Sequence, residues 1–215
     1  NNNYDGVGPT SSCTGRAEAR RVSMTLERTP HMATDLGALI IVDMQRCMAE
    51  PVAGARNNPD AEANIASLLS AWRRAQLPIV HVRHLSRTVG SLFWPGQVGA
   101  EFQPQSEPLP HEHIVEKNVP DAFLNTGLER WLRVRGVEHV VVTGVSTNIS
   151  VESTVRTASN LGFQVIVVSD ATFAFDKPDY AGVLRSAAEV HAMSLANLSG
   201  EFAAVLRASE VLSAL

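Results

Sequence analysis

VVVTGVSTNISVESTVRTASNLGFQVIVVSD, residues 140–170, is the stretch that decides the fold of this chain. Both of its ends are apolar runs typical of buried parallel strands. The stretch predicts a strand, a tight turn, a helix and a second strand, with Ser150 on the first turn of the helix. In open α/β sheets, chemistry takes place beyond the carboxyl ends of the strands. Backbone N–H groups and the helix dipole there favour negative charge, so Ser150 is a candidate nucleophile.

Strand-like and helix-like segments alternate on both sides of this unit. The apolar run ALIIVD at 38–43 is typical of a central parallel strand, and apolar residues at i, i+3, i+4 and i+7 predict a helix over 61–75. Further strands are expected at 78–83, 113–116, 139–143, 164–169 and, as an edge strand, 202–205, and further helices at 127–135, 180–199 and 210–215. This alternation predicts one three-layer α/β/α domain over 37–215, with a mostly parallel sheet of about six strands.

Two segments do not follow this alternation. Residues 1–36 are polar, show no sustained periodicity and lack the apolar centre of a secretory signal, so we interpret them as an N-terminal arm held by a neighbouring subunit. Residues 86–111 carry seven glycines and prolines. An irregular run of that length inside a domain is usually a binding loop or a lid.

Composition excludes several classes of function. Hydrophobic residues make up 45% and charged residues 19% of the 215, which is ordinary for a globular protein. A net charge of −4 argues against nucleic acid or an anionic membrane as a partner. Apolar runs are too short to cross a bilayer, and two cysteines make no disulfide framework, so a cytoplasmic location is expected.

Polar residues end the strands of the predicted sheet. Asp43 and Lys117 each terminate a strand, and Ser150 follows a third strand through the turn. These carboxyl ends share one edge of a parallel sheet, so an acid, an amine and a nucleophile converge there. Asp43 beside an ammonium would act as a general base, with Lys117 polarising the substrate. An ion pair at strand ends with no catalytic role fits the spacing equally well.

Three motifs carry a resemblance to a known family: IIVDMQ at 40–45, EKNVPDAF at 116–123 and TGVSTNISVESTVRTASNLGFQVIVVSDA at 143–171. In this order and spacing they resemble the isochorismatase-like, or cysteine hydrolase, superfamily. The resemblance implies hydrolysis of a non-peptide C–N bond in a small amide, ureido or carbamoyl compound. It implies no organic cofactor, and a homodimer or homotetramer. Nicotinamidases of this superfamily carry an Asp/His metal site, but no Asp-x-His accompanies His81 and His84 here, so no metal is expected. The resemblance does not fix the substrate.

The resemblance assigns roles to individual positions. Asp43 matches the catalytic acid of the family, Lys117 its lysine and Ser150 its nucleophilic cysteine. It also implies a cis peptide bond between Val145 and Ser146. The N–H groups of Ser146 and Ser150 would then point at a developing oxyanion.

Serine at position 150 departs from the family pattern. A helix N-terminus lowers the pKa of a thiol toward neutrality, whereas a hydroxyl needs a strong adjacent base such as histidine. One explanation is an engineered Cys→Ser change that traps substrate in an amidohydrolase. A second is a natural serine, as in isochorismatase-type enzymes that protonate a vinyl ether with the acid alone. A third is a non-catalytic member of the fold that binds a small molecule.

Several other residues are candidates for the pocket. Gln45, His84, Trp94 and Phe123 are expected to contact substrate, and ordinary core packing is the alternative for each. Cys47 lies four residues after Asp43, but no helix N-terminus is predicted beside it, so it is not expected to be the nucleophile.

Overall fold

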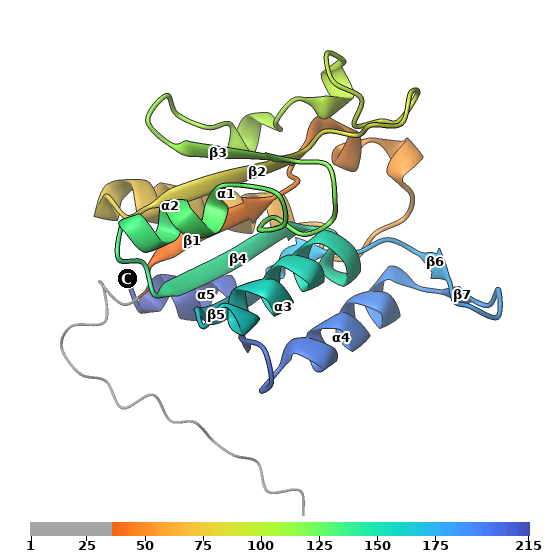
Figure 1. The fold of residues 1–215 in the computed structure, drawn as a ribbon. Helices are drawn as coiled ribbons and strands as arrows, with labels where there is room; N and C mark the ends of the chain where they lie inside the picture. Colours follow the sequence, from red (N-terminus) through yellow and green to blue (C-terminus); the bar gives the residue numbers. More distant parts are fainter. Residues whose placement is uncertain (1–35) are drawn as a thin grey trace, which may run out of the picture. The chain divides into compact units, whose positions relative to one another are not determined.

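The computed structural model describes residues 36–215, and nearly all of the predicted arm lies outside these residues. A six-stranded sheet has the order β3-β2-β1-β4-β5-β8 (Figure 1), and every neighbouring pair is parallel. The strands are β1 (Ala38–Val42), β2 (Ile79–His84), β3 (His113–Lys117), β4 (His139–Val145), β5 (Gln164–Phe173) and β8 (Ala204–Leu206). The predicted α/β class, the sheet and the edge position of the last strand are confirmed.

β1 and β4 form the centre of the sheet, and all five residues of β1 are buried. They pair in register from Ala38↔Val140 to Val42↔Gly144. Gly144 has a φ of +113°, and a Cβ atom there would lie 2.0 Å from the carbonyl oxygen of Val42. Only glycine therefore allows the two strands to approach closely where they lead into the site.

Helices cover both faces of the sheet (Figure 1). One core cluster packs the sheet against α2 (Leu128–Val134), α3 (Glu152–Asn160) and α4 (Ala187–Leu198). The other packs it against α1 (Ala61–Ala75) and α5 (Ala208–Ser213), where Ile65 and Trp72 of α1 are fully buried. Because helices shield both faces, the central strands β1 and β4 are buried nearly throughout, whereas the edge strand β3 alternates between buried and exposed residues. Within residues 36–215, no helix has the length and hydrophobicity needed to span a membrane.

The helix predicted over 180–199 is wrong in its first third. α4 begins only at Ala187, because Ser186 caps it: the Ser186 hydroxyl accepts from the Glu189 N–H, and the Glu189 carboxylate accepts from the Ser186 N–H. The residues before it form a small hairpin, β6 (Lys177–Pro178) and β7 (Leu184–Arg185). Asp179 closes this hairpin by accepting hydrogen bonds from the N–H groups of Ala181 and Val183.

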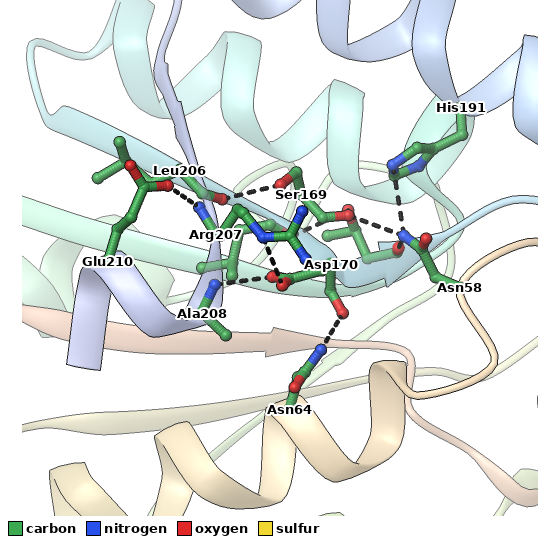
Figure 2. Close-up of polar contacts among 11 residues, drawn as sticks. Asn58, Asn64, Ser169, Asp170, His191, Leu206, Arg207, Ala208 and Glu210 are labelled. Carbon is green, nitrogen blue, oxygen red and sulfur yellow. Dashed lines mark hydrogen bonds and ion pairs between the residues drawn. The ribbon is translucent and has the colours of Figure 1, made fainter. Parts of the chain in front are cut away.

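β5 continues past its predicted end at Ser169, and its pairing with β4 changes register there. Two asparagine side chains stabilise the irregular stretch (Figure 2). Asn58 donates to the carbonyl oxygens of Ser169 and Thr172 at 2.8 and 2.6 Å, and Asn64 donates to that of Asp170 at 2.7 Å. The Asp170 carboxylate accepts from the Ala208 N–H at 2.7 Å, as expected of a capping acid.

The long loop predicted over 86–111 contains only two short 3-10 turns, η4 (Val98–Ala100) and η5 (Pro104–Ser106). It is anchored to the segment that follows β1. The Gln103 N–H donates to the Met44 carbonyl oxygen at 3.0 Å, and the Gln103 side chain donates to the Gln45 carbonyl oxygen at 3.1 Å. These two bonds therefore attach the loop to the residues that directly follow Asp43, the candidate catalytic acid.

Candidate active site

The candidate site lies at the carboxyl ends of the strands, where the chain order in the sheet reverses. β2 and β3 extend the sheet on one side of β1, while β4 and β5 extend it on the other. Such a switch point opens a crevice beyond the strand ends. Asp43 follows β1 directly with a φ of +51°, a left-handed backbone that aspartate tolerates better than most residues. Lys117 is the last residue of β3, and Ser150 lies past the end of β4.

The structure brings Asp43, Lys117 and Ser150 together. Lys117 Nζ donates to Asp43 Oδ2 at 2.7 Å and to Ser150 Oγ at 3.4 Å. The Lys117 side chain is fully buried, and that of Asp43 is 5% exposed. The Lys117 ammonium group therefore contacts both the candidate acid, Asp43, and the candidate nucleophile, Ser150. Their roles in catalysis remain a prediction.

Burial controls the proton affinity of Asp43. It raises the pKa of the carboxyl above its ordinary value, although the charge and hydrogen bond of Lys117 oppose the rise. Among the described residues, Asp43 Oδ1 is buried and has no hydrogen-bond partner. An acid whose pKa is shifted toward neutrality, with one oxygen unpaired, is suited to accept and return a proton.

Ser150 lies in a π turn, η6 (Thr147–Val151), and α3 begins just after it at Glu152. Ser150 was expected on the first turn of an α-helix. In the structure it lies instead in the π turn, which is wider than an α-helical turn, and α3 begins only after it. The Val145–Ser146 peptide bond is cis, as the family resemblance implied.

Helix α4 holds this π turn from the side. His191 Nδ1 and Thr147 Oγ1 are hydrogen-bonded at 2.8 Å, and the Ser194 hydroxyl donates to the Thr147 carbonyl oxygen at 3.0 Å. Both α4 side chains are buried. α4 therefore fixes the segment that presents Ser150, through contacts that the sequence did not predict.

A cavity of about 310 Å³ opens onto the acid and the serine. Its wall contains Asp43, Met48, Ala53, His84, Phe93, Pro120, Val145, Ser146, Ile149, Ser150 and Phe175. His84 lies at the end of β2, and the Phe93 ring packs edge-on against its imidazole at a centroid distance of 5.2 Å. Burial lowers the pKa of His84, and the charge of Lys117 lowers it further. The imidazole on the wall is thus neutral at pH 7.

Three of the four expected substrate contacts, Gln45, Trp94 and Phe123, do not line the cavity. The Gln45 side chain is fully buried and bonds to backbone: Nε2 donates to the His84 and Ala100 carbonyl oxygens, and Oε1 accepts from the His84 N–H. Phe123 is a core residue, packed at 5.9 Å from the Phe163 ring. Trp94 is outside the wall, while its neighbour Phe93 is in it.

Other titratable residues lie away from the cavity. His81 and Glu112 form a buried pair at 2.8 Å, to which Arg73 adds a second ion pair. Cys47 is buried, and burial raises the pKa of its thiol to about 12, which does not suit a nucleophile. Within residues 36–215, no three His, Cys, Asp or Glu side chains are grouped as metal ligands would be.

Sequence reasoning did not find the loop residues of the wall. Met48 and Ala53 come from 3-10 turns after β1, Pro120 from the loop after β3, and Phe175 from the segment after β5. None of them belongs to a periodic pattern. Phe175 reaches the cavity only because β5 continues beyond Ser169.

Comparison with known proteins gives a consistent result. Residues 37–210 match the isochorismatase domain family. The chain is 37% identical over 176 residues to the isochorismatase family protein YrdC of Bacillus subtilis, covering 82% of this chain and 94% of YrdC. It is 49% identical to an isochorismatase-family crystal structure from Chromobacterium violaceum, with a TM-score of 0.82 and coverage of 84% and 94% of the two chains.

Two more distant relatives have names that state an activity. Nicotinamidase 3 of Arabidopsis thaliana is 29% identical and matches 90% of this chain and 91% of its own length. The ureidoacrylate amidohydrolase RutB of Variovorax paradoxus is 29% identical and matches 63% of this chain and 68% of its own. Both names describe hydrolysis of a C–N bond.

Proposed function

The chain belongs to the isochorismatase family of hydrolases, and from that premise we propose that it cleaves a non-peptide C–N bond in a small amide, ureido or carbamoyl compound. The observation that carries the proposal is the contact of one buried lysine with both the acid and the serine: Lys117 Nζ lies 2.7 Å from Asp43 Oδ2 and 3.4 Å from Ser150 Oγ. The amidohydrolase relatives support the choice of a C–N bond.

The side chain at position 150 attacks the substrate carbonyl carbon, and Asp43 takes the proton of that side chain. The resulting oxyanion is stabilised by the N–H groups of Ser146 and Ser150. When the tetrahedral intermediate collapses, the C–N bond breaks and Asp43 gives its proton to the leaving nitrogen. Water then attacks the acyl group, Asp43 takes a proton from it, and the same proton returns to the side chain at position 150 as the acid product leaves.

Serine makes the first of these steps slow. Its hydroxyl has a far higher pKa than a thiol, and the ammonium of Lys117 cannot remove a proton from it. His84 is on the same cavity wall as a neutral imidazole, but no hydrogen bond joins it to Ser150. We therefore propose that the chain with serine binds substrate and turns it over slowly.

Exchange of residue 150 tests this function. The present chain, Ser150→Cys and Ser150→Ala are compared for ammonia release from a panel of small amides and ureido acids, and intact mass reports an acyl adduct. A gain for cysteine of more than about tenfold, with an adduct at residue 150, supports the proposal. Equal, negligible turnover by all three over the panel contradicts it.

A vinyl-ether hydrolase of the isochorismatase type is the second candidate, because one observation favours it. Asp43 has a raised pKa, and its buried Oδ1 has no hydrogen-bond partner within residues 36–215, so it can deliver a proton without any nucleophile. This mechanism predicts cleavage of isochorismate that is lost in Asp43→Asn but kept in Ser150→Ala. Loss in both variants contradicts it. If the present chain and Ser150→Cys bind small molecules but cleave neither amides nor isochorismate, the protein is a non-catalytic member of the fold.

A further inference from the structure

The charges on the cavity wall limit which substrates fit. Asp43 supplies the one carboxyl group of the wall, and His84 its one imidazole. Among the described residues, no lysine or arginine lines the cavity, because the fully buried Lys117 lies behind Asp43 and forms an ion pair with it. The wall therefore offers the carboxylate of a substrate no cationic side chain as a partner.

The arginines around the site do not change this balance. Arg46 forms an ion pair with Glu101 at 3.3 Å, and Arg56 forms one with Glu62 at 2.6 Å. Arg87 follows β2 on the exposed surface and is not part of the wall. A carboxylate of a bound substrate would have to leave water for an apolar wall and lie near the Asp43 carboxyl, and both effects oppose binding.

The remaining wall is apolar and the space is small. Met48, Phe93, Pro120, Ile149 and Phe175 contribute side chains that exclude water from a ligand. A cavity of about 310 Å³ is at the lower end of the range found for small-molecule pockets, so it suits a small ligand. Such a ligand gains affinity by burying apolar surface rather than by pairing charge.

We propose that the site selects neutral amides with a small apolar substituent, and that it rejects amides that carry a carboxylate. This inference rests on the proposed function, because it places the amide group at Asp43 and position 150. It narrows the amide, ureido and carbamoyl class to its uncharged members. It also argues against isochorismate, which is a dianion.

Two isosteric probes test the selection by charge. 4-Methylpentanamide and succinamate have the same shape, but the first ends in an isopropyl group and the second in a carboxylate. Isothermal titration on the present chain, at pH 7 and low salt, measures both dissociation constants without requiring turnover. We expect the neutral probe to bind at least about tenfold more tightly, which corresponds to about 1.4 kcal/mol.

Paired variants separate the charge of the site from general hydrophobic binding. Ala53→Lys adds a cation to the wall, and Val52→Lys adds the same cation one residue away, at a side chain that is 66% exposed and outside the wall. Ala53→Lys should shift the preference toward succinamate by at least about tenfold, and Val52→Lys should leave it unchanged.

Two binding results for the present chain would overturn the inference: succinamate binding as tightly as its neutral isostere, or no binding of either probe. An equal response to the two lysine variants would do the same. Failure of the proposed function gives a different pattern, in which the probes bind with the expected preference but Ser150→Cys cleaves none of the amides.

Discussion

Gln45→Glu provides a sharp test of how the site is supported. The Gln45 side chain is fully buried and makes three hydrogen bonds to backbone: two N–H donors at 2.9 Å to the carbonyl oxygens of His84 and Ala100, and one acceptor at 2.7 Å from the His84 N–H. A carboxylate in its place can still accept from the N–H. Its second oxygen faces two carbonyl oxygens, so burial and repulsion raise the pKa of the introduced carboxyl.

The energetic cost follows from this shift. If the folded state keeps the carboxyl protonated at pH 7, while the unfolded chain ionises near its ordinary pKa of about 4.3, the cost is about 3.7 kcal/mol. The loss grows as the pH rises above about 4.3, because the folded state then binds a proton that the unfolded state has released. Lowering the pH toward about 4.3 removes this pH-dependent part of the cost, because the unfolded chain then also keeps its carboxyl protonated. A further cost of about 1–3 kcal/mol remains, since a protonated carboxyl donates one hydrogen bond where the amide donated two.

Urea denaturation between pH 4.5 and 7.5 measures this profile against the parent chain. Relative to the parent, Gln45→Glu should lose about 1.4 kcal/mol for each unit that the pH rises. Gln45→Leu is the control, since it removes the same bonds without a titratable group and its loss should not depend on pH. Parental stability of Gln45→Glu at pH 7, with a weaker affinity for substrate, would refute the reasoning and restore Gln45 as a substrate contact.

Three further predictions concern residues around the site. Burial alone would raise the pKa of Glu112, but the hydrogen bonds that the carboxylate accepts lower it to about 2. The stability of the protein should therefore fall as the pH drops from about 4.5 to 2. In acid denaturation, Glu112→Gln should lack this pH dependence, and it should lose about 2 kcal/mol of stability at neutral pH. In a Cys13→Ser background, the buried Cys47 thiol, with a pKa of about 12, should resist alkylation at pH 8 until urea unfolds the chain, and rapid labelling of the native protein would contradict its burial. Thr147→Val removes the 2.8 Å hydrogen bond to His191 and should lower kcat more than it changes KM, by loosening the turn that carries Ser150; an unchanged kcat would exclude this positioning role.

The central part of the fold could be predicted because its signals are local. Buried parallel strands are continuous apolar runs, and β1 and β4 lie where those runs predict them. The helix over 180–199 was overextended because apolar residues at its start resemble a helical face. The Ser186–Glu189 capping box is a sequence signal that would have corrected the error.

The site could be predicted only where strands end. Asp43, Lys117 and Ser150 are fixed by strand position, so a sheet edge brings them together. Gln45 and Phe123 lie in the family motifs, but the Gln45 side chain bonds to backbone and Phe123 packs in the core. Both lie in irregular segments, where no periodic pattern predicts the direction of a side chain. Phe175 required knowledge of the β5 extension, which depends on side chains more than a hundred residues away, such as Asn58.

The most direct test of the central claim is to measure ammonia release by Ser150→Cys with and without a second change, Asp43→Asn, on 4-methylpentanamide. The account predicts that Ser150→Cys turns the amide over and that Asp43→Asn in this background lowers kcat on the order of a hundredfold or more, because the proton then has no carrier. A Ser150→Cys enzyme that keeps its rate after Asp43→Asn would contradict the claim that Asp43, Lys117 and residue 150 act as one catalytic unit.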